Sequence, residues 1–213
     1  MNKVTIIDYG LGNLYSIRRA IEHLGGQVDI SDQPSVISSA KKLILPGVGA
    51  FGEGMSNLAK RGLIEPIKEH MACGKMLLGI CLGMQLMMDE SEEFGIHKGL
   101  GIIRGKVKRL SLYAGTEHYK IPHVGWSSIS HPVSTENRWA AAILKDVPSG
   151  SFFYFVHSFA AIPDDVTATA AVTEYGGRSF SSVIVKKNFF GCQFHPEKSA
   201  DAGLAVLKNF LTL

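Results

Sequence analysis

Three short apolar segments in the N-terminal half alternate with stretches of helical periodicity, and this alternation constrains the fold more than any other feature. The apolar segments are residues 4–7, Lys42–Leu45 and Met76–Ile80. After the first, four apolar residues recur at helical spacing: Leu14, Ile17, Ile21 and Leu24. Continuously apolar strands that alternate with helices are typical of parallel sheets covered on both faces. The sequence therefore predicts an α/β fold with a mostly parallel sheet.

The rest of the chain adds helices and further strands. A helical region is predicted over residues 51–72, with a break near Gly62, and a last helix over 201–210. Further strands are predicted in five places: residues 102–109, 152–156, 168–173, 182–185 and 189–194. The polar stretches 111–118 and 131–138 are predicted as loops. Because the sequence contains no repeat and no linker, we expect one domain over residues 1–213.

Composition excludes several classes of function. A net charge of +3 and the absence of basic clusters argue against a nucleic-acid or membrane-surface partner. No stretch approaches the roughly 18 apolar residues of a membrane span. The three widely spaced cysteines, Cys73, Cys81 and Cys192, favour a reducing cytoplasm over a disulfide framework. No Cys/His group has the spacing of zinc ligands, so we expect no metal.

The stretch DYGLGN near the start first suggests a dinucleotide-binding loop. Gly10 and Gly12 follow a strand and precede a helix, but Tyr15 stands where the third glycine of that pattern belongs. A tight strand-to-helix turn is the better interpretation, and no organic cofactor is expected.

The stretch Gly79-Ile80-Cys81-Leu82-Gly83 has the form of a nucleophile elbow. Glycines on both sides permit a sharp turn that presents the cysteine, and a following helix N-terminus favours the thiolate. The N–H of Leu82 would then face an oxyanion. For Cys73 and Cys192 the ordinary interpretation, a small buried side chain, is preferred.

GCQFHPEKS near the C-terminus offers a base for the thiol. His195 and Glu197 are two residues apart, so an extended backbone places both side chains on one side. Glu197 can fix the tautomer of His195 while the other ring nitrogen faces the thiol. His123 and His157 could line a site or pack in the core. Five other histidines are predicted at the surface: His23, His70, His97, His118 and His131.

Together, GICLGMQ and GCQFHPE resemble the class I (triad) glutamine amidotransferases. Four shorter stretches resemble the glutaminase subunit of imidazole glycerol phosphate synthase: DYGLGN, PGVGAF at 46–51, KIPHVGW at 120–126 and FYFVHSF at 153–159. The similarity spans nearly the whole chain. It implies the class I glutaminase fold, a flavodoxin-like, mostly parallel sheet with an antiparallel extension. It also implies L-glutamine as the substrate.

The resemblance assigns roles to particular residues. Cys81 would be the nucleophile, His195 the general acid/base and Glu197 its orienting partner. A second oxyanion N–H would come from Val48 or Gly49, beside that of Leu82. Four residues would shape the glutamine pocket: Gly47, Gln85, Ser158 and Phe159.

The resemblance also implies a TIM-barrel cyclase/synthase partner in a heterodimer, to which ammonia passes in histidine biosynthesis. The matching docking positions are Asn13, Lys120, His123, Trp126 and Lys198. Two residues depart from the subfamily pattern: Ser127 replaces the usual asparagine and Phe159 a common tyrosine.

Three alternatives stay open from the sequence. A glutaminase could feed another acceptor, such as a sugar-modifying amidotransferase, and Ser127 keeps that possibility. A cysteine peptidase or DJ-1-like protein is opposed by Glu197 and Gln85. A non-catalytic binding subunit is opposed by the intact triad.

Overall fold

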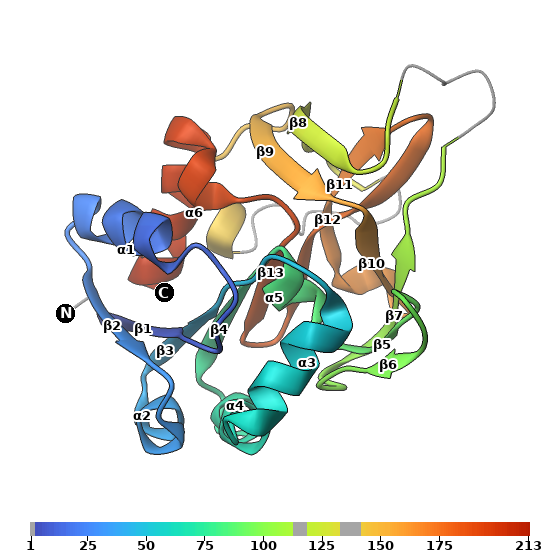
Figure 1. Cartoon of the computed structure of the whole chain (residues 1–213). Helices are drawn as coiled ribbons and strands as arrows, with labels where there is room; N and C mark the ends of the chain where they lie inside the picture. Colours follow the sequence, from blue (N-terminus) through green and yellow to red (C-terminus); the bar gives the residue numbers. More distant parts are fainter. Residues whose placement is uncertain (1–2, 113–118, 133–141) are drawn as a thin grey trace.

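A seven-stranded sheet forms the centre of the computed structural model, which describes residues 3–112, 119–132 and 142–213 (Figure 1). Its strand order is β11-β12-β13-β4-β3-β1-β2. The bounds are β1 (Lys3–Ile7), β2 (Gln27–Ser31), β3 (Lys42–Leu45), β4 (Met76–Ile80), β11 (Thr169–Tyr175), β12 (Arg178–Lys186) and β13 (Phe189–Cys192). Strands β2, β1, β3, β4 and β13 run parallel, and β12 and β11 extend the sheet in antiparallel fashion. This arrangement confirms the predicted fold class.

Helices cover both faces of this sheet (Figure 1). The bounds are α1 (Leu14–His23) and α6 (Ala200–Thr212) on one face, and α2 (Pro34–Ser39), α3 (Phe51–Lys60) and α4 (Ile64–Ala72) on the other. Ile44 and Leu78 join the apolar cluster that contains α1 and α6, whereas Leu45 and Leu77 join the cluster with α2, α3 and α4. Because both faces are covered, the central strands are apolar throughout, in line with the sequence pattern. None of the helices in the described ranges is long and apolar enough to cross a membrane.

The predicted break in the 51–72 helix is confirmed. α3 ends at Lys60 and α4 begins at Ile64, and Gly62 between them has φ +66°. Glycine occupies this left-handed conformation without a steric penalty, so the chain can turn there.

Two smaller sheets lie beside the central one. One has the order β10-β7-β5-β6, and the other is the antiparallel pair β8-β9. Their bounds are β5 (Met88–Ser91), β6 (His97–Lys98), β7 (Ile103–Arg109), β8 (His123–Ser128), β9 (Phe152–His157) and β10 (Phe159–Pro163). Short helical segments are α5 (Leu82–Gln85), η2 (Ala142–Leu144), η3 (Val166–Ala168) and η4 (Pro196–Lys198).

Strands β7, β9, β11, β12 and β13 and helix α6 correspond to predicted elements. Strands β2, β5, β6, β8 and β10 and helix α2 were not predicted from the sequence. Of the two predicted loops, residues 111–112 and 131–132 are in neither helix nor strand. Residues 113–118 and 133–138 lie outside the described part of the chain.

The pairing of β4 with β13 brings two distant segments to one edge of the sheet. These strands are parallel and in register, with Ile80 opposite Cys192, and the N–H of Cys81 donates to the carbonyl oxygen of Cys192 over 2.8 Å. Both strands therefore end together, and the residues that follow them, Cys81 and His195, lie at the same edge.

Candidate active site

Cys81 lies in a sharp turn between β4 and α5. Its backbone has φ 51° and ψ −109°, a combination that residues with a Cβ rarely adopt. The turn packs closely on the neighbouring strand, because a Cβ on Gly83 would overlap the carbonyl oxygen of Leu45. The strained strand-to-helix connection predicted from the glycines is thereby confirmed.

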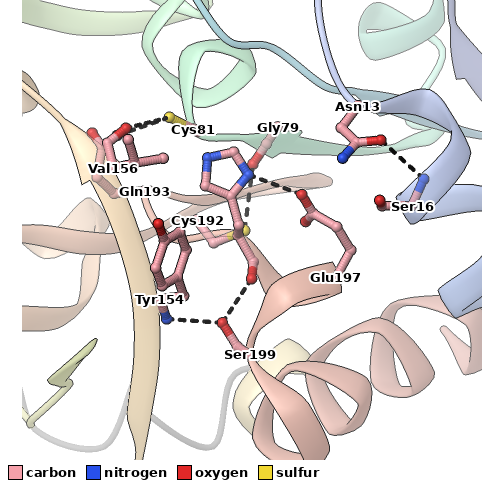
Figure 2. A network of polar contacts seen from close by, with 11 residues as sticks. Asn13, Ser16, Gly79, Cys81, Tyr154, Val156, Cys192, Gln193, Glu197 and Ser199 are labelled. Carbon is pink, nitrogen blue, oxygen red and sulfur yellow. Dashed lines mark hydrogen bonds and ion pairs between the residues drawn. The ribbon is translucent and has the colours of Figure 1, made fainter. Parts of the chain in front are cut away.

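His195 and Glu197 form a buried pair directly after β13. The Nδ1–H of His195 donates to Oε1 of Glu197 over 2.9 Å, and the two side chains are 2% and 1% exposed. Ser199 fixes the backbone around them: its hydroxyl donates to the carbonyl oxygen of His195 and accepts from the N–H of Tyr154 (Figure 2). The predicted orientation of the histidine by the carboxylate is present in the structure.

The electrostatic surroundings of His195 favour its protonated form. Burial by itself lowers the pKa of His195, but the adjacent Cys81 sulfur and the Glu197 carboxylate outweigh burial and raise the pKa to about 10. Among the described residues, none accepts a hydrogen bond of normal geometry from Nε2. The Cys81 sulfur thus stabilises the protonated imidazole by its proximity, while the Nε2 proton remains available for transfer.

A pocket of about 260 Å³ opens at Cys81. Its lining comes from several elements: Val48, Gly49, Cys81, Leu82, Gln85, Glu93, Pro122, Val156, His157, Ser158 and Phe159. The predicted nucleophile, oxyanion residues and substrate residues are among them, with the exception of Gly47. His195 does not line the pocket, since its side chain is buried.

The loop after β3 brings the predicted oxyanion residues to the pocket. The Tyr9 hydroxyl donates to the carbonyl oxygen of Pro46 over 2.7 Å, which anchors this loop. A Cβ on Gly47 would lie 2.7 Å from the Cβ of Leu82, so Gly47 allows the loop to approach α5 rather than lining the pocket. As the first residue of a helix, Leu82 has an N–H without an intrahelical acceptor. Leu82, Val48 and Gly49 all line the pocket.

Gln85 and Gln193 link the pocket wall to the sulfur of Cys81. The Gln85 Nε2 group donates to the carbonyl oxygen of Phe159 over 2.8 Å and to Oε1 of Gln193 over 3.1 Å. The Gln193 Nε2 group lies 3.6 Å from the Cys81 sulfur. Sequence reasoning found Gln85 but missed Gln193, although its position two residues before His195 on an extended segment was a usable signal.

Glu93 is a second pocket residue that sequence reasoning missed. It contributes the one carboxylate among the described residues that line the pocket, and its Oε2 accepts from the N–H of Phe51 over 2.7 Å. Nothing local distinguishes Glu93 from other acidic residues in its polar loop. Only the packing of that loop against the start of α3 brings it to the pocket.

An exposed apolar face borders the pocket. Strand alternation places five side chains on the outer side of the β8-β9 pair: Val124, Trp126, Phe152, Tyr154 and Val156. Trp126 is 51% exposed and lies edge-on to Tyr154, which is its partner across the strands. The Lys198 Nζ lies 5.8 Å from the Tyr154 ring centroid. Val156 also lines the pocket, so this outer face of β8-β9 continues into the pocket wall.

The other predicted docking residues occupy different environments. Lys120 is exposed just before β8, whereas the side chain of Asn13 caps α1 by accepting from the N–H of Ser16 over 3.1 Å. His123 is only 1% exposed. Its ring points inward from β8 and stacks on Tyr175, so its burial does not fit the predicted place on a docking face.

Two predictions about single residues were wrong. Cys73 is exposed, because it follows the last residue of α4 and lies beyond the buried face of that helix. His70 is buried, since it lies three residues after Ile67 on the apolar side of the same helix and its Nε2 contacts the carbonyl oxygen of Met76.

Cys192 is buried as predicted. His23 and His131 are exposed, His97 is half-buried, and His118 lies outside the described residues.

No group of three or more His, Cys, Asp or Glu side chains arranged to hold a metal ion occurs in the described ranges. The side chains that the structure brings together at the site are the Cys81 thiol, the His195 imidazole, the Glu93 and Glu197 carboxylates and the Gln85 and Gln193 carboxamides.

Comparison with known protein families gives a match over almost the whole chain. The profile of "Glutamine amidotransferase class-I" matches residues 5–213. The chain is 45% identical, over 100% of both chains, to "Imidazole glycerol phosphate synthase subunit HisH 1" of Legionella pneumophila (strain Lens). It is 46% identical to the HisH subunit of Chlorobaculum tepidum, over 97% of this chain and 98% of that one.

Solved structures agree in fold. PurLQS from Thermotoga maritima superposes with a TM-score of 0.71 at 16% identity, covering 99% of this chain and 97% of that chain. The glutaminase domain of Trypanosoma brucei CTPS gives a TM-score of 0.63 at 14% identity, covering 99% of this chain and 94% of that chain. At these identities the likeness concerns the fold alone.

Proposed function

Because the chain belongs to the class-I glutamine amidotransferases and, within them, to the HisH subunits of imidazole glycerol phosphate synthase, we propose that it hydrolyses the side-chain amide of L-glutamine and supplies the ammonia to a synthase partner. The observation that carries this proposal is the meeting of Cys81, at the strained turn, with the buried His195–Glu197 pair at one edge of the sheet.

The first chemical step is attack of the Cys81 thiolate on the amide carbon. The carbon–sulfur bond forms and the carbonyl oxygen becomes an oxyanion. Backbone N–H groups of Leu82 and of the Val48–Gly49 loop stabilise that charge, and each such donor is worth roughly 3–4 kcal/mol in related sites. The strain at Cys81 is useful here, because it directs the sulfur into the pocket and leaves the Leu82 N–H beside it.

Proton transfer then falls to His195. Its raised pKa means that the imidazolium is present at neutral pH, and its Nε2 proton goes to the leaving ammonia as the carbon–nitrogen bond breaks. The now neutral imidazole takes a proton from water, which attacks the thioester and releases glutamate. Glu197 keeps Nδ1 protonated through both steps, so Nε2 remains the reactive nitrogen.

Free glutamine carries a positively charged α-ammonium group, and the pocket contains a carboxylate that can bind it. We assign Glu93 to the α-ammonium group, since it supplies the carboxylate among the described lining residues. Ser158, Phe159 and Gln85 line the same pocket. This placement puts the amide end of glutamine toward Cys81.

The outer face of β8-β9 is the surface that we assign to the synthase partner, which would have the TIM-barrel fold and form a heterodimer with this chain in histidine biosynthesis. Exposed Val124, Trp126 and Phe152 form an apolar surface of the kind that marks protein contacts, and Lys198 lies at its edge. Ammonia is readily lost to water, so a docking face that reaches the pocket at Val156 suits direct transfer. The free cysteines are consistent with a cytoplasmic location.

The similarity to HisH subunits over the full chain favours this proposal over another ammonia acceptor, a peptidase or a DJ-1-like protein. In the sequence, Ser127 left open a partner that uses the ammonia in a different reaction. In the structure, the Oγ of Ser127 lies 2.9 Å from Nε2 of His123, so this residue has a structural role.

The test is ammonia release from L-glutamine by the chain alone and with the liganded synthase partner, with Cys81→Ser as the control. We expect weak release by the lone chain, a large increase with the partner and none from Cys81→Ser. Peptide cleavage without ammonia release would overturn the proposal.

A further inference from the structure

A chain of side-chain hydrogen bonds runs through the interior from strand β8 to the sulfur of Cys81. It passes through seven residues: Ser127, His123, His157, Phe159, Gln85, Gln193 and Cys81. The chemical steps described above do not use Gln193 or the two histidines. The direction of every bond in this chain follows from one atom, the carbonyl oxygen of Phe159.

That carbonyl oxygen can only accept, and two groups contact it. His157 Nδ1 lies 2.9 Å away and the Gln85 side-chain nitrogen 2.8 Å away. Both must therefore donate. This requirement fixes the tautomer of His157 and the orientation of the Gln85 amide, which distances alone leave ambiguous.

On the histidine side, each further bond follows from the previous one. Burial lowers the pKa of His157 to about 3 and that of His123 to about 4, so both rings are neutral at neutral pH. A neutral His157 that donates from Nδ1 has Nε2 free to accept, and His123 Nδ1 lies 3.2 Å from it. His123 then accepts at Nε2 from the hydroxyl of Ser127, 2.9 Å away.

On the glutamine side, the same reasoning reaches the nucleophile. The second N–H of Gln85 points at a side-chain atom of Gln193 over 3.1 Å, so that atom is the amide oxygen. The amide nitrogen of Gln193 must then face the Cys81 sulfur, 3.6 Å away. Gln193 is 0% exposed, so water cannot replace this donor. Figure 2 shows Gln193 near Cys81.

We propose that Gln193 is a positioning residue for catalysis: its Nε2–H donates to the Cys81 sulfur and stabilises the thiolate, and the Phe159 carbonyl fixes the direction of that bond through Gln85. A thiolate is a stronger acceptor than a thiol, so this bond favours the reactive form of Cys81. The inference deepens the proposed glutaminase function and rests on it for its consequence, but the bond itself can be tested without glutamine.

Besides the Gln193 amide, several titratable groups act on Cys81, and a test of Gln193 must leave those groups unchanged. His195 lies beside it with Glu197 behind, Tyr9 acts from the end of β1, and Cys192 from β13. Replacing only Gln193 preserves all four. Gln193→Met keeps the length of the side chain, removes its N–H donors and suits a buried apolar setting.

The experiment is the rate of alkylation of Cys81 by iodoacetamide as a function of pH, followed by peptide mass spectrometry. Exposed Cys73 in the same chain is the internal reference, and Gln27→Met, on the exposed edge strand β2, is the matched control. We expect Cys81 to be alkylated about tenfold more slowly at neutral pH in Gln193→Met than in the parent. Cys73 and the control variant should keep the profile of the parent. Coincident Cys81 profiles for Gln193→Met and the parent would overturn the proposal.

A measurement on the unsubstituted protein covers the case in which Gln193→Met does not fold. Long-range ¹H–¹⁵N NMR at neutral pH should show His123 and His157 neutral with the proton on Nδ1, and alkylation of Cys81 should shift the side-chain amide signal of Gln193. A proton on Nε2 of His157, or an unmoved Gln193 amide, would contradict the proposal. If the unsubstituted, unalkylated protein released no ammonia from glutamine, the proposed function would be wrong even with the Gln193–Cys81 bond present. The two failures are therefore distinguishable.

Discussion

Nδ1 of His195 lies 2.9 Å from Oε1 of Glu197, and both side chains are almost completely removed from water. In this setting the carboxylate cannot be replaced by solvent. The pair therefore determines which nitrogen of the imidazole holds the proton and how strongly the ring holds its charge.

Replacing Glu197 with glutamine should reduce kcat by about two to four orders of magnitude, because the amide can present the wrong partner to Nδ1. Affinity for glutamine should be largely kept, since Glu197 does not line the pocket. The carboxylate also helps to raise the pKa of His195. The alkaline limb of the pH–rate profile should therefore move to lower pH in the variant. Steady-state kinetics from pH 6 to 10 checks both points, and equal kcat values would exclude the orienting role.

Glu93→Gln should raise KM for glutamine by about tenfold to a hundredfold with a smaller effect on kcat, because it removes the charge assigned to the α-ammonium group. Glu92→Gln is the matched control, since Glu92 is the exposed neighbour that pairs with Lys108 outside the pocket. An unchanged KM in Glu93→Gln would place the ammonium group elsewhere.

Trp126→Ala and Lys198→Ala should weaken activation by the synthase partner while leaving the thermal midpoint close to that of the parent. Half of the Trp126 side chain is exposed, so little core packing is lost on truncation. Ammonia release with and without the liganded partner, beside a melting curve for each variant, makes the distinction. An early melt with normal activation would show that Trp126 is chiefly structural.

The buried histidine pair predicts loss of stability in acid. His123 and His157 have pKa values of about 4 and about 3, below the ordinary value of 6.5, so the unfolded chain binds protons that the folded chain does not. Stability from this pair is complete above pH 6.5 and decreases as pH falls, down to about 4 for His123 and about 3 for His157, by up to about 1.4 kcal/mol per pH unit for each ring. His123→Phe should reduce that slope in denaturant titrations, whereas His23→Gln, at an exposed position, should not. A parent stability independent of pH between 6.5 and 4 would contradict these assignments.

The sequence predicted those parts of the fold whose signals are local. β3 and β4 are buried on both faces and read as continuous apolar runs, and the glycines around Cys81 marked the turn. β8 was missed because His123, Gly125 and Ser127 interrupt its apolar pattern, and its identity as a strand depends on pairing with β9, more than twenty residues away. β10 was missed for a similar reason, since its partner β7 lies far along the chain.

The same distinction holds for the site. The local sequence around three site residues predicts their chemistry: Cys81, His195 and Glu197. The sequence around Glu93 does not, and Gln193 offered only its place two residues before His195, because their roles arise from contacts with residues distant in sequence or with a pocket built from several elements. Gln193 contacts Cys81 across 112 positions of the sequence, and Glu93 contacts Phe51 across 42.

The most direct test of the central claim is the site of labelling by a glutamine-analogue electrophile. Cys73 is exposed and Cys81 is buried, so a reagent that reacted by access alone would modify Cys73 first. We predict a single adduct on Cys81, formed faster than any on Cys73 or Cys192 and suppressed by excess L-glutamine. Preferential modification of Cys73 or Cys192, or an adduct on Cys81 that glutamine does not suppress, would contradict the assignment of Cys81 as the glutaminase nucleophile.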